Sequence, residues 1–392
     1  MKAISAIPLA ILLSAGVSLS AQEAPKEAKP AAPPAAPADP FLKEKEKKAK
    51  EAAPSPDKII NVGTLFQYID VKRERWQKWL AENETPLDAG ALRREVDGWL
   101  STGDAELAET SLIMGKSGLR SKVESNREVF YPVEFTVDPG GLALPTSFER
   151  KNTGTTAEVD PVLNLEGGVE MNFAPERVNY AGENPPRKEN GAEEGDIRWP
   201  LFASQRVNCM VILTATQWGL IGCETSLDRA ETHQTLIFAR PALHRFEDKP
   251  AAGPTNGQGM LTFQWIEVGH DQLNGWLMGD GDLSASIGGG LHEKALAAGA
   301  TLLNERVVRF RTGQRVKNES IREVIYPTAY DRGEEADDHA SPAALETRNV
   351  GTTVEVDPVF NETDTILDLN MAPETVFHLG ESIHHRVLVN GA

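Results

Sequence analysis

The sequence predicts an α+β fold, β-rich with antiparallel sheets, in which an amphipathic helical stretch occurs in each of two repeated domains. Short runs of alternating apolar and polar residues recur along the chain, and this period-two pattern is typical of half-buried strands. Four blocks of sequence occur twice in the same order. Helical stretches set among antiparallel strands define the α+β class.

Each repeat opens with a strand that leads into helix. The run FQYIDV at 66–71 recurs as FQWIEV at 263–268. Apolar residues at helical spacing then predict helices at 71–80 and 91–100 in the first repeat, with a proline between them. In the second repeat the clearer helix is predicted at 291–298.

Three further blocks recur after the helices. They are REVFYP at 127–132 and REVIYP at 322–327, NTGTTAEVDPV at 152–162 and NVGTTVEVDPV at 349–359, and APE at 174–176 and 372–374. The offset between the copies stays between 195 and 198 residues. Such a period is far longer than the 20–50 residues of solenoid repeats, so we interpret it as a duplicated domain.

The longest recurring block predicts a half-buried strand that pairs with a second strand in a hairpin. The second strands are predicted at 169–173 and 366–370. The motif positions of the block are Asn152, Gly154, Thr155, Thr156, Val159 and Pro161, matched by Asn349, Gly351, Thr352, Thr353, Val356 and Pro358. The preceding Tyr131–Pro132 and Tyr326–Pro327 pairs are predicted to mark strand ends or an edge, because proline cannot donate a ladder hydrogen bond.

The two copies differ at their ends. The first copy continues into three apolar strands predicted at 207–214, 219–222 and 235–239, whereas the second has nothing equivalent after 387–389. The second copy should therefore present an unpaired edge, and such an edge templates pairing with another strand. First-copy strands or a second molecule could cover it, and the sequence favours self-association through this edge.

Composition along the chain predicts five segments. A short apolar run followed by small residues predicts a signal peptide at 1–21. The segment 22–57 is built from Ala, Pro, Lys and Glu and is expected to be a disordered spacer. The first copy then spans 58–246, a linker 247–258, and the second copy 259–392. The protein is therefore expected to be exported, to the periplasm or the outer membrane.

Charge limits the classes of partner. The formal net charge is −18, which argues against nucleic acid because phosphate binding requires clustered Lys and Arg. No motif for a cofactor or a metal was found, so none is predicted. The expected partners are proteins of the cell envelope, and association with a membrane is left open.

The two cysteines, Cys209 and Cys223, have two interpretations. In an oxidising compartment a disulfide persists. A hairpin that turns about Thr216 would place the two residues opposite one another, at a separation that suits a bridge. In the other interpretation, both are small buried hydrophobes that never bond.

The recurring blocks resemble the secretin domain, the channel-forming module of bacterial type II and type III secretion systems. The resemblance rests on the order of the elements and on the GTTxEVDP run at 154–161 and 351–358. It implies two divergent secretin domains, the second truncated. Unlike secretins, the chain has a spacer where they carry small ring-building domains, and it has two channel modules rather than one.

Paired carboxylates are the remaining candidates for chemistry. Glu158 with Asp160, and Glu355 with Asp357, share a strand face at i, i+2 spacing, where two acids can perform acid–base work or hold a cation. A solvated strand face that ends in an Asp-Pro turn is the favoured interpretation, and a hydrolase is the remote alternative. The leading hypothesis is a non-enzymatic, secretin-like envelope protein that acts through protein–protein contacts and is linked to protein secretion. The alternative is a true outer-membrane secretin channel or channel component.

Overall fold

The computed structural model describes residues 60–83, 89–137, 143–184, 199–246, 257–279, 291–331, 341–361 and 365–380. The predicted signal peptide and spacer lie outside these residues. Within the described ranges, no helix is both long enough and apolar enough to cross a membrane. We refer below to residues 60–246 as the first unit and to residues 257–380 as the second unit.

The predicted fold class is confirmed, because antiparallel sheets with a few short helices make up the described chain. A four-stranded sheet in the first unit has the order β2-β1-β10-β9. Its strands are β1 (Ile60–Lys72), β2 (Ala105–Lys116), β9 (Gly219–Thr225) and β10 (His233–Arg245). The second unit has a two-stranded counterpart of β11 (Gln258–Glu267) and β12 (Thr301–Arg311).

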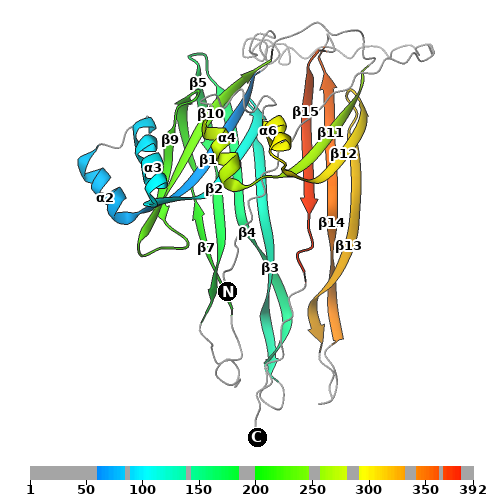
Figure 1. Cartoon of the computed structure of the whole chain (residues 1–392). Helices are drawn as coiled ribbons and strands as arrows, with labels where there is room; N and C mark the ends of the chain where they lie inside the picture. The colour runs from blue at the N-terminus through cyan, green and yellow to red at the C-terminus, as the bar shows by residue number, and fades with distance from the viewer. Residues whose placement is uncertain are drawn as a thin grey trace, which may run out of the picture.

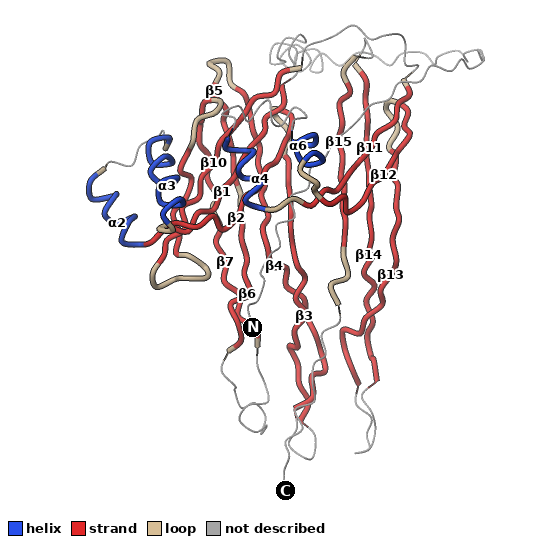
Figure 2. The backbone as a smooth tube through the Cα atoms, in the orientation of Figure 1, coloured by secondary structure: helices blue, strands red, loops and turns tan. Residues whose placement is uncertain are grey.

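A nine-stranded sheet runs through both units, with the order β15-β14-β13-β4-β5-β8 and with β3, β6 and β7 paired alongside. Its first-unit strands are β3 (Ser121–Val137), β4 (Ala143–Leu163), β5 (Gly168–Phe173), β6 (Glu176–Glu183), β7 (Pro200–Arg206) and β8 (Cys209–Thr214). Its second-unit strands are β13 (Val316–Asp331), β14 (Ser341–Phe360) and β15 (Leu367–Val376). The long hairpins β3–β4 and β13–β14 run in the same direction, away from the helices (Figures 1 and 2).

Three of the four helices of the described chain form near the predicted positions, and α4 (His270–Gly279) is a helix that the sequence does not predict. The other three are α2 (Arg73–Glu82), α3 (Gly90–Thr102) and α6 (Leu291–Ala297). In α2 the buried side chains of Trp76 and Trp79 stack on one another, with ring centroids 5.4 Å apart. Helix α3 ends at Gly103, whose φ of 76° is the left-handed conformation that favours glycine after a helix. Apolar residues of all four helices join one core cluster with β1 and β10.

A second core lies between the four-stranded sheet and the long sheet. Phe66 of β1 meets Phe173 of β5 edge to face, with ring centroids 5.3 Å apart. Both side chains are fully buried, as are Ala157 and Met171 of the same cluster. The alternation of apolar residues along β4 and β5 therefore places one face of this sheet against β1.

The Tyr–Pro pairs do not end their strands, so that part of the prediction is wrong. Strand β3 continues past Pro132 to Val137, and β13 continues past Pro327 to Asp331. In both strands the pairing register shifts directly after the proline. A bulge at this point interrupts the ladder locally, and bulges are among the few places where a sheet tolerates proline.

The two long hairpins pair in matching registers. In β3–β4, Glu128 lies opposite Asn152 and Pro132 opposite Phe148. In β13–β14, Glu323 lies opposite Asn349, and Pro327 lies opposite Leu345. The hairpins predicted between β4 and β5 and between β14 and β15 are also present.

The second unit lacks partners for two of its strands among the described residues. In the first unit, β1 pairs with both β2 and β10, and β5 pairs with both β4 and β8. In the second unit, β11 pairs only with β12, and β15 pairs only with β14, within the part of the chain that the structure describes. The unpaired edge predicted from the sequence is therefore present over these residues.

Candidate interaction surfaces

The carboxylate pairs are each bound by an arginine. Arg120 contacts Glu158 at 2.8 Å and Asp160 at 2.8 Å. The hydrogen bonds that Arg120 donates to Asp160 are the main reason that its pKa lies above the ordinary value. Arg315 binds Glu355 at 2.9 Å and Asp357 at 2.8 Å in the same way. These acids therefore lie in matching ion-pair clusters rather than as free carboxylates beside a nucleophile. Within the described ranges, no group of three or more His, Cys, Asp and Glu residues could hold a metal ion.

The motif glycines allow two backbones to approach one another closely. Gly154 has a φ of +123°, and a Cβ atom built there would lie 2.1 Å from the carbonyl oxygen of Ser125. Gly351 has a φ of +133°, and its Cβ would lie 2.2 Å from the carbonyl oxygen of Ser320. Only glycine avoids both the clash and the unfavourable backbone conformation. The motif therefore sets the shape of the hairpin.

The other motif positions are also structural. Val159 and Val356 are buried in the cores of their units, and Thr352 is buried beside Thr375. The carbonyl oxygens of Pro161 and Pro358 accept hydrogen bonds from the glycine N–H groups of the preceding turns, at 2.7 and 2.8 Å. None of these residues lines the cavity beside α3 that is described below.

The cysteines are not paired, and the predicted hairpin about Thr216 is wrong. The chain does turn there, and Thr216 has a φ of 68°. Strand β8, with Cys209, then pairs with β5, whereas β9, with Cys223, pairs with β10. The two strands belong to different sheets, so both thiols are free, and burial raises the pKa of each.

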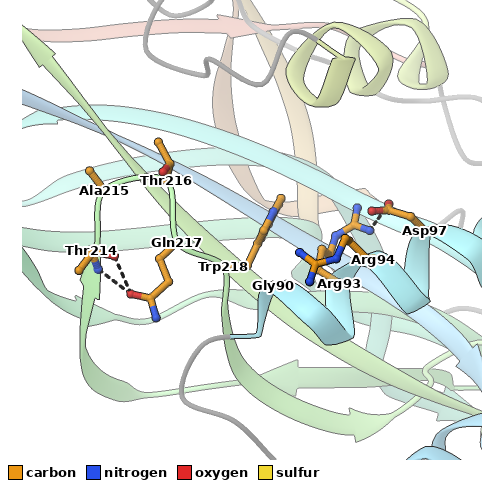
Figure 3. Close-up of a pocket in the computed structure, with 9 residues that line it drawn as sticks. All are labelled: Gly90, Arg93, Arg94, Asp97, Thr214, Ala215, Thr216, Gln217 and Trp218. Carbon is orange, nitrogen blue, oxygen red and sulfur yellow. Dashed lines mark hydrogen bonds and ion pairs between the residues drawn. The ribbon is translucent and has the colours of Figure 1, made fainter.

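A cavity of about 410 Å³ lies between the N-terminus of α3 and the turn that links β8 to β9 (Figure 3). The Arg93 side chain is buried there, and its guanidinium carbon lies 5.1 Å from the ring centroid of Trp218 and 5.8 Å from that of Phe238. It donates hydrogen bonds to Asp97 and to Gln67, and burial lowers its pKa. Buried cations need such partners, so Arg93 stabilises the core here. The cavity contains none of the site residues that the sequence predicts.

The contact between the two long hairpins brings together aromatic residues from both units. One face of β3–β4 carries Glu128, Phe130, Pro132 and Phe148, and we call it the phenylalanine face. The rings of Phe130 and Tyr326 meet edge to face with centroids 5.0 Å apart, and those of Phe148 and Tyr330 do so with centroids 6.0 Å apart. Aromatic pairs in this geometry add to the free energy of burial.

Polar contacts reinforce the same junction. Glu128 of the phenylalanine face forms an ion pair with Arg348 of β14 at 2.9 Å. Lys116 at the end of β2 forms an ion pair with Asp368 of β15. Gln67 of β1 donates a hydrogen bond of 2.6 Å to Asn274 of α4. The two units are thus joined by the contact between the long hairpins, by ion pairs, and by a hydrogen bond between β1 and α4.

Sequence reasoning did not identify this junction. The motif REVFYP already holds Glu128 and Phe130 on one face of β3 and Tyr131 on the other. That alternation could have indicated an apolar outer face. It could not indicate which segment covers it, because the covering residues lie about 200 residues later in the sequence.

Glu109 of β2 links stability to pH at this junction. Burial raises its pKa, and the charges of His270 and Arg177 only partly oppose that effect. Because the folded-state pKa lies above the unfolded-state value, the folded state binds the proton more tightly. The contribution of Glu109 to the free energy of unfolding should therefore increase as the pH falls from neutral through the raised pKa.

The substitution Glu109→Gln removes this titration. We expect the variant to be more stable than the natural chain at pH 7 and to approach it at acidic pH, where Glu109 is protonated in both states. Urea unfolding between pH 4 and 7 measures the difference. Glu95→Gln, at an exposed position of α3, is the control. Parallel pH profiles for the natural chain and Glu109→Gln would contradict the assignment.

Comparison with known proteins gives a likeness at the level of solved structures. No protein-family model matches the chain. No curated protein matches it either. The secretin domain of InvG from the Salmonella SPI-1 injectisome is similar at a TM-score of 0.28 and 11% identity, over 54% of this chain and 69% of that one.

Two further secretins are similar to the same degree. Aeromonas hydrophila ExeD has a TM-score of 0.28 at 11% identity, over 53% of each chain. A chain of the pilotin–secretin complex AspS–GspD from ETEC has a TM-score of 0.29 at 11% identity, over 53% of this chain and 54% of that one. The chain thus spans about half the length of these two proteins.

Proposed function

We propose that this chain is a non-enzymatic, secretin-like protein of the cell envelope that builds a wall of β-hairpins together with other protein subunits. In this proposal it is exported, and the wall belongs to a channel for protein secretion. The observation that supports it is the packing of β3–β4 against β13–β14. In that packing, two hairpins of this fold lie side by side within one chain.

The length of the hairpins supports a role in a larger assembly. The residues of β14 from Ser341 to Thr347 are all exposed, although they continue a strand whose other half has one face buried in the second unit. A long exposed edge strand presents unpaired backbone groups to which a strand of another chain can be added. The hairpins therefore have the form of subunits that are completed by assembly.

The matching contacts support the predicted duplication. The arginine clusters, the glycine approach and the hairpin register occur once in each unit at corresponding positions. We propose that the two units are divergent copies of one domain. In this proposal the chain supplies two neighbouring hairpins of the wall instead of one.

A second candidate is an envelope protein that binds protein partners without forming a pore. The outward faces of β4 and β14 favour it, because Glu158, Asp160, Glu355 and Asp357 keep charged side chains on them. A wall in contact with lipid should be free of charge at mid-depth. The two candidates differ in whether a pore forms.

The experiment is detergent extraction of the mature full chain, followed by negative-stain microscopy and by conductance across a planar bilayer. Closed multimers with stepwise conductance are expected for the channel. Multimers without conductance would overturn the channel and support the second candidate. Monomeric particles without conductance, at all concentrations tested, would overturn the wall-building proposal.

A further inference from the structure

The cavity beside α3 has a positively charged lining. Figure 3 shows Arg93 and Arg94 of α3 on one side, the turn Thr214–Gln217 on the other, and Trp218 between them. Among the described lining residues the only carboxylate is that of Asp97, and it is already paired with Arg93. This lining therefore carries a net positive charge, in a chain whose formal net charge is −18.

Two groups of the lining are left to donate hydrogen bonds. Arg94 is exposed and forms no ion pair or hydrogen bond with another described residue. The Oε1 atom of Gln217 accepts hydrogen bonds from the backbone N–H and the hydroxyl of Thr214, at 2.8 and 2.9 Å. The NH₂ group of the same amide has no partner among the described residues. A guanidinium and an amide NH₂ are donors that suit a carboxylate.

A second cation lies close to Arg93. The guanidinium carbons of Arg93 and Arg240 lie 5.1 and 5.5 Å from the ring centroid of Trp218. Burial lowers the pKa of Arg93, and the charge of Arg240 adds to that effect. The Nε–H group of Arg93 is buried and has no hydrogen-bond partner within the described ranges. An anion in the cavity would offset the repulsion between these two cations.

We propose that this cavity binds the carboxylate at the end of a peptide chain, with Arg94 and the Gln217 amide as its direct ligands and the buried Arg93 as a supporting charge. The volume of about 410 Å³ lies within the range of roughly 300–1,000 Å³ that small-molecule sites occupy. The cavity is thus large enough for a few residues of peptide rather than for a lone ion. The planar guanidinium matches the two oxygens of a carboxylate. Such a site does not depend on whether the chain forms a channel.

The site occurs in the first unit and not in the second over the described residues. One side of the cavity is the turn between β8 and β9, and the described part of the second unit has no counterpart of these two strands. Strand β15 corresponds to β5, and it pairs only with β14 within the described ranges, whereas β5 also pairs with β8. One peptide is therefore expected to bind per chain.

The test is titration calorimetry of the full chain with N-acetyl-trialanine at low ionic strength. The only charge of this peptide is its carboxylate. N-acetyl-trialanine amide lacks that charge, and it should bind at least about tenfold more weakly because the arginine then has no anionic partner. Equal binding of the acid and the amide would overturn the proposal. Tighter binding of inorganic phosphate than of the acid would also overturn it, because the site would then not select a chain end.

Two variants change the direct ligands. Arg94→Gln removes the exposed cation and should weaken binding of the acid at least about tenfold, with little effect on the amide. Gln217→Glu keeps the oxygen that accepts hydrogen bonds from Thr214 but replaces the NH₂ group by a second carboxylate oxygen, so it should abolish binding of the acid. Arg322→Gln changes an exposed arginine of β13 in the same way and is the matched control, which should bind the acid as the natural chain does.

Thermal unfolding separates a lost site from a lost fold. Gln217→Glu should unfold at no lower a temperature than the natural chain, because its new carboxylate lines the same cavity as Arg93 and Arg94. The proposal is overturned if Arg94→Gln binds the acid as tightly as the natural chain, or if Gln217→Glu still binds it.

These outcomes are separate from those of the proposed function. A chain that conducts but does not bind the acid would overturn the site and leave the channel standing. A chain that binds the acid through Arg94 but does not conduct would support the site and overturn the channel.

Discussion

Replacing Gly154 or Gly351 with alanine should lower the free energy of unfolding by about 3 kcal/mol at either site. Both glycines have a positive φ, and a Cβ atom would lie little more than 2 Å from a carbonyl oxygen of the partner strand. That oxygen belongs to the backbone of β3 or β13, so relief requires the two strands to separate. Separation would break ladder hydrogen bonds on both sides of the glycine.

Urea unfolding followed by circular dichroism measures this loss. Gly98→Ala is the matched control, because Gly98 lies within α3 and a Cβ there has nothing within 4 Å. Alanine at that site should raise stability by about 0.5–1 kcal/mol through its better helix propensity. Equal stability of Gly154→Ala and the natural chain would show that the hairpin does not need the close approach.

Replacing Asp70 with alanine should cost about 3 kcal/mol, since it leaves buried donors without an acceptor. The Asp70 carboxylate is buried and accepts hydrogen bonds from Thr235 at 2.5 Å and from Ser226 at 2.9 Å. Arg229 donates a third, longer hydrogen bond to it at 3.4 Å. These donors come from β10 and from the loop before it.

The second unit supplies the control for this change. Glu267 occupies the position that matches Asp70, but it is exposed, because β11 has no strand equivalent to β10 beside it in the described chain. Glu267→Ala should change stability by no more than about 0.5 kcal/mol. Thermal unfolding of the two variants side by side measures the contrast. Similar losses from both would contradict the role assigned to β10.

Local patterns predicted the strands and hairpins because their causes are local. The alternation in the block around Gly154 indicates which face of β4 is buried. The turn between β2 and β3 contains Gly118, whose positive φ is a conformation that glycine adopts readily. The sequence also predicts an unpaired edge in the second copy, and β11 and β15 each pair with a single strand among the described residues.

Pairings between distant segments could not be predicted. The sequence places Cys209 and Cys223 on two neighbouring strands, but β8 and β9 join different sheets, each completed by residues far away in the chain. Strand β7 was missed because its seven residues, Pro200–Arg206, follow a polar loop and alternate only weakly. The sequence predicts a strand end or an edge at Pro132, because a proline alone does not reveal that a β-bulge will accommodate it inside a longer strand.

The covalent link between the two units makes one of the hairpin contacts independent of concentration. The phenylalanine face meets β13–β14 within a single chain, so the effective concentration of the two surfaces is set by the length of chain between them rather than by expression level. Dilution can separate one chain from another, but it cannot separate these two hairpins. A cell that makes few copies of the protein would therefore begin any assembly from pairs of hairpins that are already in register.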